Sequence, residues 1–152
     1  MNSIPSYPDA IAYIRGENQV PVLCGQVKFY QKKNHVIVSV NIKGLPPSSS
    51  GFYGFHIHEG NSCEGHGFPD TGTHYNPAGI SHPSHPGDLP PLMLCGGGAR
   101  QTVATDRFQV VDVIGRTVVI HSMPDDFTSQ PAGNAGIKIA CGVIVGRKKN
   151  HF

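Results

Sequence analysis

Histidines are the residues of this chain whose type and spacing could do chemistry. The stretch GFHIHEG, residues 54–60, places His56 and His58 two positions apart in an apolar run. Successive side chains of a strand point to opposite faces, so residues i and i+2 share a face and both imidazoles would look the same way. Taken alone, such a pair is more often a solvated surface feature. The other histidines favour a functional interpretation.

A second group of histidines lies in a long segment without strand signals. Residues 59–99, about forty in all, carry no convincing strand pattern, and a loop of that length in a compact domain is usually functional or disordered. Simple disorder is the weaker explanation, because four of the nine histidines of the chain lie there: His66, His74, His82 and His85.

The end of that segment spaces its polar side chains regularly. In HPSHPGD, residues 82–88, Asp88 follows His85 at the same interval that separates His85 from His82. The prolines between them exclude a helical face. We therefore expect a stiff loop that could present two imidazoles and one carboxylate to a single point.

Metal chemistry accounts for both groups. Neutral imidazole suits copper and zinc, and zinc also accepts a carboxylate. Three histidines and an aspartate from the loop would fill a tetrahedral zinc site with no open position, which is typical of a structural metal. His56, His58 and His121 lie on or beside predicted strands. Together with one shared histidine they could hold a second metal that keeps room for a small ligand.

Strands are the elements that must position these residues. Residues 36–45 place Val36, Val38, Val40 and Ile42 on one face, a period of two that indicates a half-buried strand. Further strands are predicted over residues 22–31, 116–122 and 137–146, with a weaker candidate over 100–110. We predict a single all-β domain over residues 1–152, a sandwich or barrel with Greek-key connections.

Composition narrows the possible partners and the location. A net charge of +2 is too small to argue for nucleic acid, and no apolar run approaches the length of a membrane span. The first ten residues lack the pattern of a secretory signal, and Met1 is retained. We expect a cytoplasmic protein, with an extracytoplasmic location as the alternative.

Linked motifs give the chain a resemblance to a known family. In order and near spacing, the segments GFHIHE, GTHYNP, HPGDLPPL, IGRTVVIH, DD, GNAG and KIACGVI resemble the copper/zinc superoxide dismutases, over about Val22 to Val145. The short HIHEGNSC is similar to the bacterial branch of that family. The resemblance implies a Greek-key β-sandwich, or flattened eight-stranded barrel, with long metal-binding loops.

The resemblance also implies roles for matching positions. Copper would be held by His56, His58, His74 and His121, and zinc by His74, His82, His85 and Asp88. His74 would bridge the two metals and take and return a proton. Asp125 would link a copper ligand, His56, to a zinc ligand, His82. Cys63 and Cys141 would form the disulfide of the family.

The implied reaction converts superoxide to oxygen and hydrogen peroxide by redox cycling of copper, with zinc in a structural role; a homodimer is possible. One position departs from the family pattern, because Lys138 stands where the family has arginine at the mouth of the channel. The charge is kept but the planar fork is lost. Two rivals are a metal-binding relative with little or no dismutase activity and a copper-handling module on the same fold.

The remaining cysteines and histidines match nothing in the family pattern. Cys24 falls on the outward set of its predicted strand, and Cys95 lies in a predicted loop before GGG. Free exposed thiols fit poorly with an oxidising compartment, which also favours the cytoplasm, although a second disulfide stays open. Three further histidines are expected at the surface: His35, His66 and His151.

Overall fold

The computed structural model describes residues 7–148 of the chain. Met1 and His151 lie outside these residues, and so do the expectations that rest on them. That a single domain spans residues 1–152 stays a prediction. In the described part, the elements are β1 (Ala10–Gly16), β2 (Cys24–Gln31), β3 (Val36–Lys43), β4 (Phe52–Tyr53), β5 (Phe55–His58), the 3-10 turn η1 (Pro69–Thr71), β6 (Leu92–Met93), β7 (Gly98–Thr105), α1 (Val110–Val113), β8 (Thr117–His121) and β9 (Lys138–Gly146).

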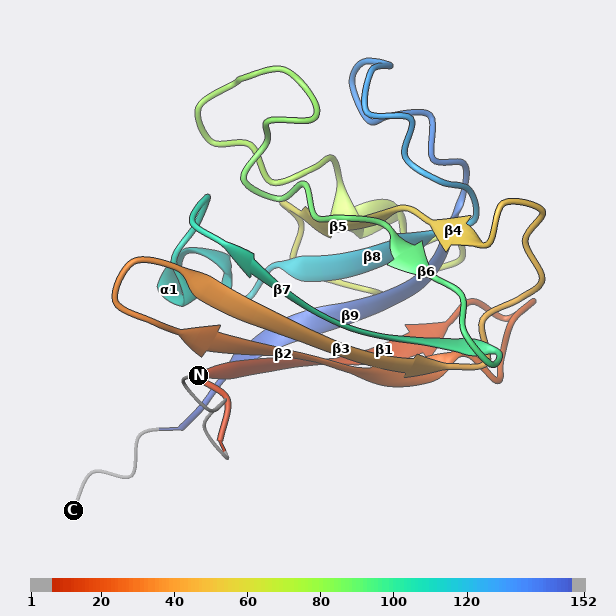
Figure 1. Cartoon of the computed structure of the whole chain (residues 1–152), viewed down its shortest axis with the longest axis horizontal. Helices are drawn as coiled ribbons and strands as arrows, with labels where there is room; N and C mark the ends of the chain where they lie inside the picture. The colour runs from red at the N-terminus through yellow and green to blue at the C-terminus, as the bar shows by residue number, and fades with distance from the viewer. Residues whose placement is uncertain (1–6, 149–152) are drawn as a thin grey trace.

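Seven strands form one curled antiparallel sheet in the order β5-β8-β9-β1-β2-β3-β7 (Figure 1). Strands β5 and β7 lie at its two edges, so the chain crosses from β3 to one edge and returns to the other. Such long returns are typical of Greek-key folds. The all-β prediction is confirmed. The sheet holds seven strands in place of eight, because β4 and β6 pair with each other outside it.

Four predicted strands are confirmed to within two residues at each end: β2, β3, β8 and β9. The weak candidate is β7, which begins at Gly98 and ends at Thr105, ahead of the short turn α1. The prediction that residues 59–99 hold no strand was therefore wrong at its far end, where β6 and the start of β7 lie. The glycines of CGGGA hide the start of β7, since glycine is rare in strand patterns.

Strand β1 was not predicted. Its buried residues Ala10, Ala12 and Ile14 alternate with more exposed ones. Two of the three are alanines, which carry little hydrophobic signal and are depleted in strands. Its place in the sheet comes from pairing with β2 on one side and β9 on the other.

The core is formed by the inward faces of the curled sheet. The side chains of Val36, Val38, Val40 and Ile42 are buried, as their period-two spacing predicted. Aromatic side chains fill the centre, among them Phe29, which meets Phe108 edge to face. This packed sheet is the rigid platform from which β5 and β8 carry histidines.

The long loop covers the outer edge of β5. Strand β5 pairs with β8 on one side only. On the other side, Ile57 N donates to Gly87 O and Tyr75 N donates to Ile57 O, both at 2.8 Å. Gly87 is required at this approach, because a Cβ there would lie 2.3 Å from Ile57 O. The loop therefore satisfies the backbone groups of a strand that would otherwise be an open edge.

A disulfide ties the same loop to the sheet. Cys63 and Cys141 are joined, with Cα atoms 5.8 Å apart, and both are buried against Phe68 and Val119. The pairing implied by the family resemblance is confirmed, while Cys24 and Cys95 carry free thiols. Within the described residues, no helix has the length and apolar character needed to span a bilayer.

Candidate metal centre

Two buried clusters of metal-ligand side chains lie next to each other and share His74. In each cluster the potential ligand atoms lie within 4.8 Å of one another. The first cluster consists of His56, His58, His74 and His121, and the second of His74, His82, His85 and Asp88. All seven residues that the sequence nominated as ligands are brought together.

Three elements carry the first cluster. His56 and His58 come from β5, and their shared face, expected from the spacing, points to His121 at the end of β8. His74 comes from the loop, where a bridge pairs it with His58 along the covered edge of β5. The sheet fixes three imidazoles, and backbone pairing with the sheet fixes the fourth.

Hydrogen bonds set the tautomers in this cluster. Nδ1 of His58 donates to the Gly72 carbonyl at 2.9 Å, and Nδ1 of His121 donates to the Gly136 carbonyl at 3.4 Å. A carbonyl can only accept, so each neutral ring keeps its lone pair on Nε2. These two Nε2 atoms face each other at 3.2 Å. Two nitrogens that ligate one ion at about 2 Å would stand about 3 Å apart.

The second cluster is built around the Asp88 carboxylate. Its Oδ1 lies 2.8 Å from His74 Nδ1, and its Oδ2 lies 3.0 Å from His82 Nδ1 and accepts from the backbone N–H of His85 at 3.0 Å. The Nδ1 atoms of His74 and His85 lie 3.3 Å apart. Three imidazoles and one carboxylate converge, the donor set of a closed zinc site.

Asp125 joins the two clusters. Its two oxygens accept from His56 Nε2 and from His82 Nε2, each at 2.8 Å. Both rings are thereby held with the proton on Nε2 and the lone pair on Nδ1, the usual work of a carboxylate behind a ligating imidazole. Gly133 lies against this contact, because a Cβ there would sit 2.0 Å from Asp125 Oδ1. The predicted link between His56 and His82 is present.

The donor atoms fit bound metals better than any protein partner. Among the buried side-chain atoms of the described residues, three ring nitrogens have no hydrogen-bond partner: His56 Nδ1, His74 Nε2 and His82 Nδ1. Leaving a buried polar atom unpaired is costly. These are the lone-pair atoms that the tautomers direct into the clusters. Copper in the first cluster and zinc in the second would satisfy all three.

Burial keeps the ligating imidazoles neutral. Desolvation lowers the pKa of His121 to about 3, and neighbouring histidines lower it further than its bond to Gly136 raises it. Desolvation also holds the pKa of His58 well below its usual range. For Asp125, burial alone would raise the pKa, but the hydrogen bonds from His56 and His82 outweigh it and hold the pKa well below the usual value. Neutral rings and an ionised carboxylate are the forms that bind metals.

Comparison with known proteins agrees with this geometry. The sequence model of the copper/zinc superoxide dismutases matches residues 23–144. The chain belongs to this family. A superoxide dismutase [Cu-Zn] of Aquifex aeolicus is 35% identical over 135 residues, which cover 79% of this chain and 78% of the relative.

Other members of the copper/zinc superoxide dismutase family match at similar levels. The protein of Caulobacter vibrioides is 31% identical over 79% of this chain and 77% of its own length. The extracellular superoxide dismutase of Rattus norvegicus is 33% identical over 82% of this chain and 55% of its own length. The Aquifex and Caulobacter relatives are in keeping with the bacterial branch that HIHEGNSC resembles.

A pocket of about 500 Å³ opens onto the first cluster of this superoxide dismutase family member. It is lined by three histidines of that cluster, His58, His74 and His121, and by Lys138. Lys138 starts β9, directly across from His121 on β8. Burial lowers the pKa of Lys138. The lysine at the family's arginine position therefore lies at the pocket, as its sequence position predicted.

Sequence reasoning missed one charged residue of the pocket. Glu17, just after β1, lines it with a side chain only 10% exposed, and its Oε1 accepts from His66 Nδ1 at 2.5 Å. His66 is 73% exposed, as expected of a surface residue, but it also lines the pocket. The two residues are far apart in the chain, and β1 itself was not predicted. The only local signal for Glu17 is its place in the polar run ENQ, residues 17–19, directly after the segment AIAYIRG.

Proposed function

We propose that this protein is a copper/zinc superoxide dismutase that converts superoxide to oxygen and hydrogen peroxide. Copper would be held by His56, His58, His74 and His121, and zinc by His74, His82, His85 and Asp88. One observation carries the proposal: the Nε2 atoms of His58 and His121 lie 3.2 Å apart with their lone pairs facing each other. Both residues line an open pocket. A cluster that is open on one side suits a small substrate.

Copper bound in this site would supply one-electron chemistry, which is what dismutation needs. The protein supplies the rest. The β5 and β8 histidines hold their lone pairs inward before any ion binds, so little reorganisation is needed. His74 offers one ring nitrogen to each cluster, and its Nε2 can hold a proton beside the pocket. Lys138 adds a positive charge that favours a small anion in the pocket.

The role of the zinc cluster is to hold His74 and the loop in position, not to transfer electrons. Zinc does no redox chemistry, and four protein ligands would leave it no open coordination site. It would hold His74 and the loop against β5. The second metal thus supports the first through the shared imidazole.

One experiment tests the metals and the activity together. The protein is reconstituted with both metals, its metal content is measured by elemental analysis, and superoxide consumption is followed by pulse radiolysis on the same sample. We expect about one copper and one zinc per chain, the ratio of one closed and one open site, and fast consumption of superoxide. Uptake of zinc without copper would contradict the proposal.

A metal-binding protein with low dismutase activity is the second candidate. The observation that favours it is the environment of Lys138, whose ammonium already meets three protein oxygens: Thr71 Oγ1, Phe68 O and Gly72 O. An ammonium has three donors, so an anion would compete for them. Full copper occupancy with slow superoxide consumption would identify this case.

Two finer points stay predictions. A homodimer is expected from the family resemblance, and light scattering of the purified protein measures it. A cytoplasmic location is expected from the free thiols of Cys24 and Cys95, although one relative is named extracellular. Fractionation of the source cells tests the location.

A further inference from the structure

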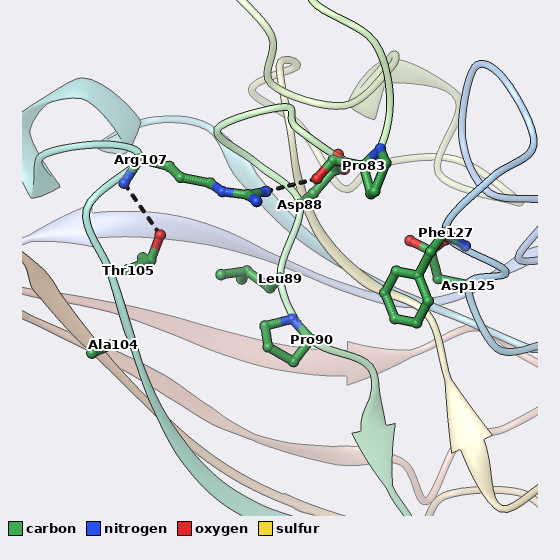
Figure 2. A pocket seen from close by; sticks show the side chains of 9 residues that line it. All are labelled: Pro83, Asp88, Leu89, Pro90, Ala104, Thr105, Arg107, Asp125 and Phe127. Carbon is green, nitrogen blue, oxygen red and sulfur yellow. Dashed lines mark hydrogen bonds between the residues drawn. The ribbon is translucent and has the colours of Figure 1, made fainter.

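A second pocket, of about 360 Å³, reaches the zinc cluster from another side. It is lined by the end of β7 and by segments that follow β5, β7 and β8, and Figure 2 shows Asp88, Arg107 and Asp125 around it. This pocket and the copper-side pocket have no lining residue in common. The two clusters therefore have separate openings.

Two of the four zinc-cluster residues line a pocket, each a different one. Of the zinc cluster, Asp88 lines the second pocket and His74 lines the copper-side pocket, while His82 and His85 line neither. Asp88 is thus the one zinc-cluster side chain that borders the second pocket. An ion that moves between solvent and this cluster, without passing the copper cluster, would meet the Asp88 carboxylate first.

The charges in this pocket suit a cation. Asp88 and Asp125, two acidic side chains, both line it. Two carboxylates on the wall of one pocket favour a divalent cation over an anion.

Arg107 is the one basic side chain among the residues that line the pocket. It follows the end of β7, and its Nη1 donates to Pro83 O at 2.7 Å and lies 3.4 Å from His85 O (Figure 2). Pro83 stands between the two zinc-cluster histidines of HPSHPGD. The guanidinium thereby pins the backbone that carries His82 and His85 to the sheet. It also places a positive charge on the pocket wall, which opposes the passage of a cation.

We propose that this pocket is the route by which zinc enters and leaves, and that Arg107 is a positioning residue that slows the exchange. The inference rests on the zinc cluster of the proposed function. It adds that zinc exchanges independently of copper and that a residue outside both ligand sets controls the rate. Without Arg107, the segment with His82 and His85 loses its anchor and the pocket wall loses its positive charge, so both effects speed zinc release.

The test measures zinc release from the copper- and zinc-loaded protein. Zinc transfer to an excess of a coloured chelator is followed by absorbance, and copper retention is followed by electron paramagnetic resonance of the same sample. For Arg107→Gln we expect zinc release to be faster by roughly tenfold or more, as expected from losing a charge-assisted hydrogen bond. The copper spectrum should keep its shape and intensity.

Two further variants separate this role from general loosening. Arg100→Gln removes an exposed arginine from β7, the strand that precedes Arg107, and should release zinc at the wild-type rate. Ala104→Trp narrows the pocket from its β7 wall, at a position outside both ligand sets, and should slow zinc release. A variant that only destabilises the fold should release zinc faster, so slower release in Ala104→Trp would not be explained by destabilisation.

The outcomes are distinguishable. Wild-type release rates in both Arg107→Gln and Ala104→Trp would overturn the proposed route. Equal acceleration of zinc and copper loss in Arg107→Gln, with wild-type behaviour of Ala104→Trp, would show general destabilisation and overturn the positioning role. A wild-type protein that binds no zinc would instead contradict the zinc cluster of the proposed function.

Discussion

His58 and Lys138 share one hydrogen-bond acceptor, the carbonyl oxygen of Gly72. His58 Nδ1 donates to it at 2.9 Å and Lys138 Nζ at 3.3 Å. Lys138 also donates to Thr71 Oγ1 at 2.7 Å. The lysine therefore braces the loop that fixes the tautomer of a copper-cluster histidine, in addition to placing a charge at the pocket.

Replacing Lys138 by methionine should slow superoxide capture and weaken its dependence on salt. A unit charge at a pocket wall contributes about 1–2 kcal/mol near the protein surface, or roughly tenfold in rate. Thr71→Val is the matched control, since it removes the closest hydrogen bond of the brace and leaves the charge. We expect its salt dependence to equal that of the wild type. Pulse radiolysis across ionic strength, at matched copper content, measures both; equal salt slopes in all three proteins would contradict the charge role.

Replacing Gly133 by alanine should damage the link between the clusters. The new Cβ would lie 2.0 Å from Asp125 Oδ1 and 2.6 Å from His82 Nε2. Gly51→Ala is a matched control, because Gly51 has the same φ of 74° and no atom within 4 Å of its Cβ position. Both variants share the backbone penalty of about 1–2 kcal/mol. Zinc affinity should fall only in Gly133→Ala, as measured by competition with a chelator, and an equal fall in both would refute the clash.

Replacing Asp125 by asparagine should weaken binding of both metals. An amide has one acceptor oxygen, so either His56 or His82 loses the partner that fixes its tautomer. Loss of such a partner typically lowers metal affinity by about 10- to 100-fold. The side chain of the neighbouring Asp126 accepts from the backbone N–H groups of Thr128 and Ser129 in its own turn, so Asp126→Asn should keep wild-type affinity. Isothermal titration with each metal decides between them.

The metal-free protein should lose stability as the pH falls below about 6.5, the usual pKa of histidine. Burial lowers the pKa of His121 to about 3, so between these values the unfolded chain binds more protons than the folded one. The free energy of unfolding then decreases as the pH falls. Thermal melts of the metal-free protein from pH 7 to pH 4 measure this decrease. His121→Gln should flatten it and His35→Gln should not; parallel curves for all three would disprove the assignment.

Part of the two clusters was predictable because its signals are local. The spacing of His56 and His58, and that of His82, His85 and Asp88, is set by a strand and by a proline-stiffened loop. Other features depend on segments that meet only in the folded chain. Glu17 and His66 are 49 positions apart, and Arg107 reaches Pro83 across 24. No pattern of period or spacing encodes such contacts.

Because β5 is an edge strand, the zinc-cluster loop that covers it also protects the protein against aggregation. Strand β5 is an outermost strand of the sheet, and its free side is satisfied by the backbone at Tyr75 and Gly87, next to His74 and Asp88. An ion bound to those neighbours would keep this cover in place. When the ion leaves and the cover lifts, the strand offers unpaired N–H and C=O groups to another copy of the chain, which is how edge-to-edge polymers begin. Metal supply would thus govern not only turnover but whether the protein stays dispersed.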